Sequence, residues 1–386
     1  MTARNTLPLA LLLLVPAPAA LADGCPAPCS GQSSSPPNAK YLYVQPQGAI
    51  GTVAAYDTAS GRLAFSLPPG ASSADGRWHV SSFPARGHTT LARYALRTGR
   101  VVSASSVRGS WRIAVLAPTG RFAALDGGGS STTRIAIVDT VRGTVVRKIT
   151  LRGRFEVETV SADGRRMFLI QHLNDRSYLV RLFDVARNKL VTQALKASGE
   201  GSPMVGYAWS GVASPNGRWL LTLYLNTHHR HAFVHALDIV RGEPYCIALP
   251  SGHARLPTLE RYTLTLSPDG RTLFAANPAL GVVSEIALAS KRVVREVKFS
   301  PSGAGRSTRH LLAGTISRNG RTLYFSAGTG LWAYDAAYGL VRGPYPTGGR
   351  IVGFGYGARD RTIHALRADG AMLTFDAASG RRLTTG

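Results

Sequence analysis

The sequence predicts an all-β fold built from repeated four-stranded antiparallel units, and two interleaved patterns support this. In the first pattern an apolar or aromatic residue precedes Asp, a short spacer and usually Gly, with a period of about 40 to 50 residues. Its copies are Tyr56–Arg62, Tyr94–Arg100, Val138–Asp139, Phe183–Asp184, Leu237–Asp238, Ile286–Arg292, Tyr334–Asp335 and Phe375–Arg381. A fixed period of this length indicates stacked copies of one supersecondary unit.

The second pattern is Ser, any residue, Asp or Asn, Gly and Arg, with some variation. Its copies are Ser73–Arg77, Pro118–Arg121, Ser161–Arg165, Ser214–Arg218, Ser267–Arg271, Ser317–Arg321 and a degenerate Ala358–Arg361. Asp-Gly and Asn-Gly favour the left-handed backbone of a tight hairpin turn. Apolar runs such as Thr272–Ala276 follow these turns and are typical of strands.

Each unit therefore has the order strand, Asp-Gly turn, strand, loop, strand, Asp-x-x-x-Gly turn, strand. Four antiparallel strands per repeat indicate the blades of a β-propeller. A helical solenoid is disfavoured because no segment after residue 22 has a sustained 3.6-residue apolar period. The outer turns favour eight blades, the first lacking its innermost strand before Tyr41, and seven blades plus a partial sheet is the alternative.

One segment carries a family resemblance. Ser267–Arg292, with the sequence SPDGRTLFAANPALGVVSEIALASKR, resembles a blade of the bacterial YVTN-type propellers. The segment that begins at Tyr41 is similar to blades of the related lactonase-like and TolB-like propellers. The resemblance covers about residues 40 to 386 and implies the fold, whereas this superfold hosts many unrelated activities.

The N-terminal residues predict export. Arg4 gives a positive start, an apolar stretch runs from Leu7 to Ala22, and Ala20-Leu21-Ala22 is a small-x-small cleavage site. We therefore expect a signal peptide at 1–22, a Ser/Pro-rich flexible leader at 23–39 and a β-propeller domain at 40–386. The mature protein is expected to be secreted or associated with the cell envelope.

The chain has three cysteines, Cys25, Cys29 and Cys246. Cys25 and Cys29 could form a disulfide across a tight loop. Alternatively Cys25 carries a lipid anchor, since Ala22-Asp23-Gly24-Cys25 approximates a bacterial lipobox, and membrane attachment is expected only in that case. A plain secreted protein with a flexible leader is the third reading.

The chain is strongly basic, with 45 Lys and Arg against 21 Asp and Glu and a net charge of +24. This charge predicts attraction to polyanions such as cell-wall polymers, anionic lipids or acidic polysaccharide. Nucleic acid is disfavoured as a partner by export and by the lack of a reader motif. Many arginines also belong to the Gly-Arg turns of the repeat, which is an alternative source of the charge.

Catalytic and metal-binding signals are weak. The repeated Asp residues are explained as turn formers, and of the remaining carboxylates only Glu156, Glu200 and Glu260 lie in loops expected to reach one end of the ring. The sequence thus predicts no catalytic residue, no metal and no cofactor. The histidine-rich segment supplies the only weak metal candidates, and a solvated hairpin tip is the favoured reading of it; these candidates are His229, His231 and His235.

Arginines concentrate in the loops that join successive blades. The predicted ligand-binding residues are Arg154, Arg255, Arg306, Arg309 and Arg350, and further arginines in these loops are Arg108, Arg112, Arg152 and Arg261. Converging guanidinium groups bind carboxylated or phosphorylated ligands. Separate, solvated arginines are the alternative.

These observations favour a non-enzymatic, exported binding scaffold. Its inter-blade loops would bind a protein partner or an anionic cell-envelope polymer. A lactonase-like or other hydrolase that uses the same face is the alternative. Carboxylates and histidines gathered there would favour the enzyme, whereas arginines and exposed aromatic residues would favour binding.

Overall fold

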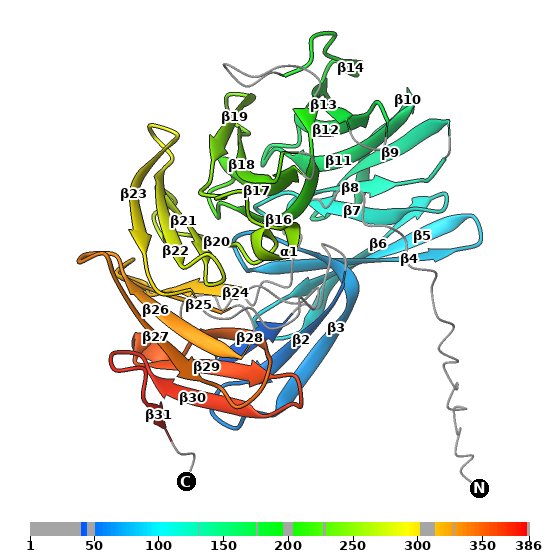
Figure 1. Cartoon of the computed structure of the whole chain (residues 1–386). Helices are drawn as coiled ribbons and strands as arrows, with labels where there is room; N and C mark the ends of the chain where they lie inside the picture. The colour runs from blue at the N-terminus through cyan, green and yellow to red at the C-terminus, as the bar shows by residue number, and fades with distance from the viewer. Residues whose placement is uncertain are drawn as a thin grey trace, which may run out of the picture.

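The computed structural model describes residues 40–44, 51–129, 131–174, 177–195, 204–226, 229–301, 313–326 and 329–383. In this part of the chain, helical structure is limited to α1 (Leu256–Leu259) and a short 3-10 helix, η1 (Ala358–Asp360). The strands form seven sheets arranged around one axis (Figure 1). The prediction of an all-β propeller is therefore confirmed.

Six of the sheets follow the repeat directly, each beginning with the strand nearest the axis. They consist of β7 (Arg112–Leu116), β8 (Phe122–Asp126), β9 (Thr132–Asp139) and β10 (Thr144–Arg152); β11 (Arg154–Val160), β12 (Arg166–His172), β13 (Ser177–Asp184), β14 (Lys189–Leu190) and β15 (Met204–Val205); β16 (Tyr207–Ala213), β17 (Trp219–Asn226), β18 (His231–Asp238) and β19 (Glu243–Ala248); β20 (Thr263–Leu266), β21 (Thr272–Asn277), β22 (Val282–Ala287) and β23 (Arg292–Lys298); β24 (Ala313–Ile316), β25 (Thr322–Ser326), β26 (Gly330–Asp335) and β27 (Leu340–Pro346); and β28 (Ile351–Tyr356), β29 (Thr362–Arg367), β30 (Met372–Asp376) and β31 (Arg382–Leu383).

The remaining sheet corrects the favoured count of eight blades to seven sheets. It has six strands, β1 (Tyr41–Val44), β2 (Gly51–Asp57), β3 (Leu63–Ser72), β4 (Trp78–Ala85), β5 (His88–Ala95) and β6 (Arg100–Arg108). The first part of β3 pairs with β2 and its last residues pair with β4. Because β3 runs on without a break, the first and second repeats share one hydrogen-bonded sheet.

The turns have the predicted chemistry. Asp238 Oδ1 accepts hydrogen bonds from the backbone N–H groups of Val240 and Arg241, at 3.1 and 3.0 Å, as expected of an Asp that caps its own turn. Gly164 and Gly270 have φ values of +71° and +69°, a left-handed conformation in which only glycine is unstrained. The predicted register of the inner turns is confirmed.

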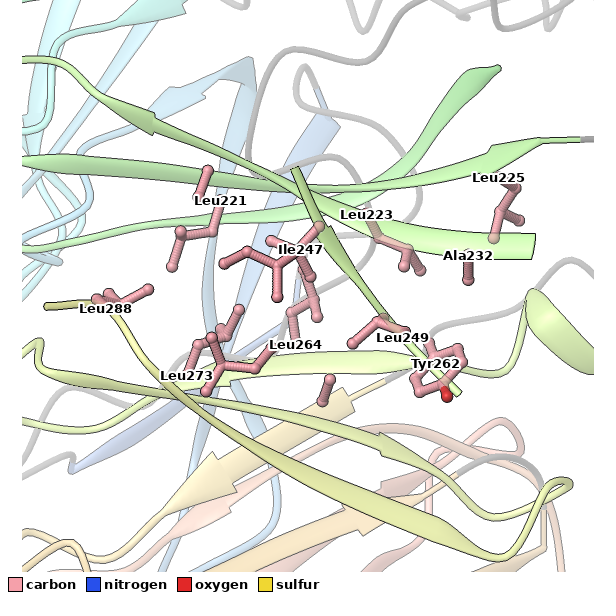
Figure 2. Packing of buried hydrophobic residues seen from close by; sticks show 14 of the residues in the cluster. Leu221, Leu223, Leu225, Ala232, Ile247, Leu249, Tyr262, Leu264, Leu273 and Leu288 are labelled. Carbon is pink, nitrogen blue, oxygen red and sulfur yellow. The ribbon is translucent and has the colours of Figure 1, made fainter. Parts of the chain in front are cut away.

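The core lies between sheets. Between β16–β19 and β20–β23, side chains of the facing strands interdigitate, as Figure 2 shows for Leu221, Leu223 and Ile247 against Leu264 and Leu273. The ring closes where Leu42 and Val44 of β1 pack against Leu366 of β29. Apolar burial between blades thus holds the ring together.

The repeat gives the ring two different ends. The Ser-x-Asp-Gly-Arg turns and the Asp-x-x-x-Gly turns lie at one end, here called the turn end. The connections between blades, and the loops between second and third strands, lie at the other, here called the loop end. Since the six regular sheets have the same strand order, each of their innermost strands begins at the loop end.

Candidate anion-binding site at the loop end

The structure places three of the predicted arginines at the loop end. Arg154 is the first residue of β11, Arg350 directly precedes β28, and Arg255 directly precedes α1, which lies near the centre of the ring (Figure 1). Arg112, the first residue of β7, occupies the same end. All four side chains are exposed. The predicted Arg306 and Arg309 lie outside the described residues.

Paired and unpaired arginines occur at both ends of the ring; at the loop end Arg367 pairs with Asp369, and at the turn end the exposed Arg62 and Arg381 have no ion pair within the described residues. At the turn end, Arg121 pairs with Asp139 and Arg218 with Asp238, each at 3.1 Å, and both carboxylates are buried. At the loop end, the described residues contain no ion pair of Arg112, Arg255 or Arg350. Positive charge at the loop end is therefore available to an external anion.

Two aromatic residues, Tyr207 and Trp209, lie at the start of the innermost strand β16. The Trp209 indole Nε1 donates to the backbone oxygen of Glu260 at 2.8 Å, and the Tyr207 hydroxyl donates to Glu260 Oε1 at 3.3 Å. The two rings meet edge to face with centroids 6.1 Å apart. Neither side chain is fully buried, so the segment next to α1 fixes both rings at the loop end.

A carboxylate and an imidazole also pair here. His172 Nε2, on β12, lies 3.3 Å from Glu156 Oε2, on β11. Glu158 lies two residues further along β11, at a bulge between Val157 and Thr159. It is buried, and neither carboxyl oxygen has a hydrogen-bond partner among the described residues. Burial, and secondarily the charge of Glu156, raises the pKa of Glu158 to about 8.

Aromatic residues extend from this carboxyl into the interface between the β11–β15 and β16–β19 sheets. Tyr224 stacks on Tyr178 and on Phe233, with centroids 5.2 and 5.6 Å apart. Burial raises the pKa of the Tyr224 hydroxyl well above its ordinary value. Burial likewise lowers the pKa of His235 to about 4, so that its ring is neutral at physiological pH.

The three weak metal candidates are not grouped in one place within the described residues. His229 and His231 lie near one another, with ring centroids 6.2 Å apart, whereas His235 is buried and contacts Cys246, whose Sγ lies 3.8 Å from Nδ1. Across the described ranges no three His, Cys, Asp or Glu side chains are grouped so that they could hold a metal ion. Cys25 lies outside those ranges. No described helix is long and apolar enough to cross a membrane.

Sequence reasoning did not single out Trp209, His172 or Glu158. A usable signal lies in the repeat, because Arg112, Glu156 and Trp209 each stand five residues before the first residue of an inner turn. Those turns are at Ala117, Ser161 and Ser214. Counting back from the turn thus identifies the same sequence position on successive innermost strands, although in β16 the bulge leaves Ser210 opposite Leu223, in the register that Arg112 and Glu156 have in their sheets.

No protein-family model matches the chain, and no curated protein sequence matches it. Several solved structures are similar to the chain in fold. Dihydro-heme d1 dehydrogenase NirN in complex with DHE is similar with a TM-score of 0.51 and 18% identity, over 94% of this chain and 76% of that chain. A putative 6-phosphogluconolactonase from Bacteroides uniformis has a TM-score of 0.43 and 16% identity, over 77% and 90%. Kuenenia stuttgartiensis hydrazine synthase has a TM-score of 0.42 and 14% identity, over 79% and 94%. At these identities the likeness concerns the fold alone.

Proposed function

We propose that the protein is an exported binding propeller whose loop end binds an anionic ligand, either an acidic protein partner or an anionic cell-envelope polymer. The observation that carries the proposal is that Arg112, Arg255 and Arg350 are exposed at the loop end and form no ion pair within the described residues.

The exposed positive charge at the loop end has a physical consequence for binding. Guanidinium groups form strong, often bidentate hydrogen bonds to carboxylates and phosphates. Their long-range attraction is screened over about 8 Å at physiological ionic strength. Binding should therefore weaken steeply as salt rises. Export through the predicted signal peptide, and membership of the YVTN-type, lactonase-like or TolB-like propellers, are further parts of the proposal that rest on the sequence.

The test compares two double variants with the same change in net charge. Arg112→Ala with Arg350→Ala removes loop-end charge, and Arg62→Ala with Arg381→Ala removes exposed charge at the turn end. With inorganic polyphosphate as the probe at fixed salt, the loop-end variant should bind about tenfold more weakly than the wild type, through the loss of two charged contacts of roughly 0.7 kcal/mol each. Equal losses in the two variants would leave only diffuse attraction and overturn the proposal.

A hydrolase of lactonase-like or other type remains the second candidate, and Glu156 is the observation in its favour. A carboxylate 3.3 Å from an imidazole nitrogen is an arrangement suited to general acid-base catalysis. Hydrolysis of lactone or ester substrates by the mature protein, abolished in Glu156→Gln and unaffected in Glu243→Gln, would support an enzyme. No turnover by the wild type would exclude those substrates.

A further inference from the structure

The outermost strand of the β7–β10 sheet, β10 (Thr144–Arg152), has one free edge. It pairs with β9 on one side, and among the described strands nothing pairs with its other side (Figure 1). A bulge interrupts the register with β9 between Val145 and Arg147, and residues 147–152 then pair one for one with residues 132–137. The backbone N–H and C=O groups along such a regular edge are a template for one more strand.

The side chains of this regular stretch separate by face. Ile149 is buried and Leu151 half-buried, and both pack in the apolar cluster between β7–β10 and β11–β15. Lys148, Thr150 and Arg152 alternate with them and are exposed. One face of the edge is therefore apolar, and the other is polar and basic.

The positive charges of β10 are not neutralised by acidic side chains. Arg147, Lys148 and Arg152 form no ion pair among the described residues. The Lys148 ammonium donates to the backbone oxygen of Arg108 at 3.1 Å and lies 5.7 Å from the centroid of the Trp111 ring. These contacts position the ammonium without cancelling its charge. Pairing with the same edge of a second copy is opposed, because like charges would face one another.

The other outer strands in the described ranges are less suited to receive a strand. β14, β15 and β31 have two residues each, and β19 and β27 contain proline, which cannot donate to a ladder. β23 carries Glu296, and its Arg295 and Lys298 are paired with glutamates. β6 is as long as β10, but the regular part of its edge, residues 103–108, has one basic residue. Length, regular pairing and unpaired positive charge thus coincide at β10.

We propose that the β10 edge receives an extended, acidic segment of a protein partner as an added strand. The backbone of that segment would continue the ladder of β10, its acidic side chains would lie beside Lys148 and Arg152, and its apolar side chains would extend the apolar face. A polysaccharide or a polyphosphate could meet the charges but has no peptide groups to pair with the strand. The inference goes beyond the proposed function, because it concerns an outermost strand, whereas Arg112 and Arg350 adjoin innermost strands.

The experiment measures binding of two labelled peptides to the full-length protein by fluorescence anisotropy at one ionic strength. One peptide alternates Glu and Val, and the other is the same peptide methylated at every backbone nitrogen. The unmodified peptide should bind at least tenfold more tightly, because methylation removes its ladder donors while keeping its charge. This comparison uses the wild type, so it is decisive even if a variant is unstable.

Two double variants with the same change in net charge then locate the site. Lys148→Glu with Arg152→Glu should weaken binding of the Glu–Val peptide at least tenfold and increase affinity for a peptide that alternates Lys and Val. Arg62→Glu with Arg381→Glu reverses two exposed charges in outer turns and should change binding of the Glu–Val peptide less than threefold.

The outcomes separate this inference from the proposed function. If the methylated peptide binds as tightly as the unmodified one, or if the two double variants lose equal affinity, only general charge attraction is present and the added strand is overturned. If sedimentation shows wild-type dimers that Lys148→Glu with Arg152→Glu abolishes, the edge pairs with a second copy and the partner is overturned. Polyphosphate binding by Arg112→Ala with Arg350→Ala tests the loop end alone, so either proposal can fail without the other.

Discussion

Replacement of Glu158 by Gln should change how stability depends on pH. The Glu158 carboxyl is buried without a hydrogen-bond partner among the described residues, and its pKa rises from 4.5 to about 8. The folded protein therefore keeps this proton up to about pH 8, whereas the unfolded chain releases it above about pH 4.5. Because the native state binds the extra proton, the free energy of unfolding falls as pH rises between those values.

The size of this change in the free energy of unfolding follows from the binding of one proton. Each pH unit contributes about 1.4 kcal/mol, so Glu158 by itself should reduce the free energy of unfolding by about 2 kcal/mol between pH 6.5 and 8. Burial lowers the pKa of His79 and His235 to about 4 and also lowers the pKa of His364. These histidines act with the opposite sign, because the unfolded chain binds more protons than the native state, and part of their effect extends into this window. The contribution of Glu158 is therefore the difference in slope between the wild type and Glu158→Gln.

Urea unfolding of the wild type, Glu158→Gln and Glu243→Gln at pH 6.5, 7.25 and 8 provides the assay. Glu243 is exposed at the start of β19, so its variant should keep the wild-type slope, whereas Glu158→Gln should lack the loss of about 2 kcal/mol that Glu158 contributes. Slopes are compared instead of absolute stabilities, because the Gln amide also lacks partners in this site. A Glu158→Gln variant whose stability changes with pH in the same way as that of the wild type would refute the reasoning.

Other predictions concern the turns and the dependence of stability on pH below 6.5. Gly164→Ala should destabilise the protein more than Gly270→Ala, because a Cβ added at Gly164 would lie 2.7 Å from the Phe122 ring, whereas one at Gly270 meets nothing closer than 3.8 Å. Gly270→Ala should cost about 1 kcal/mol for positive φ alone. Thermal melts of both variants test this, and equal losses would contradict it. Asp238→Ala should lower the free energy of unfolding by about 2 kcal/mol or more, because it leaves two backbone N–H groups and the Arg218 guanidinium without their acceptor. Asp335→Ala should cost less in the same melts, because Asp335 has no arginine partner among the described residues. His79→Gln should make the loss of stability between pH 6.5 and 4 shallower than in the wild type, as urea unfolding across that range would measure.

The repeat made most of the fold predictable. Asp-Gly and Asn-Gly turns recur in register, and each constrains the backbone within a few residues, so local chemistry was enough to give four strands per unit. The number of separate sheets was not predictable in this way. It depends on whether β3 breaks between its pairing with β2 and its pairing with β4, which both neighbours decide jointly.

By itself, the sequence determined the repeat, the turns and the arginine-rich loops between blades, because these depend on residues close together in the chain. It placed Arg154, Arg255 and Arg350 in such loops, yet gave no reason to select Trp209 or Glu158. The surroundings of Trp209 and Glu158 are determined only by the tertiary structure. The bulges in β11 and β16 depend on pairing with the next strand, and burial of Glu158 depends on the neighbouring blade. The placement of Arg112, Arg255 and Arg350, which come from separate blades, at one end of the molecule likewise arises only when the ring forms.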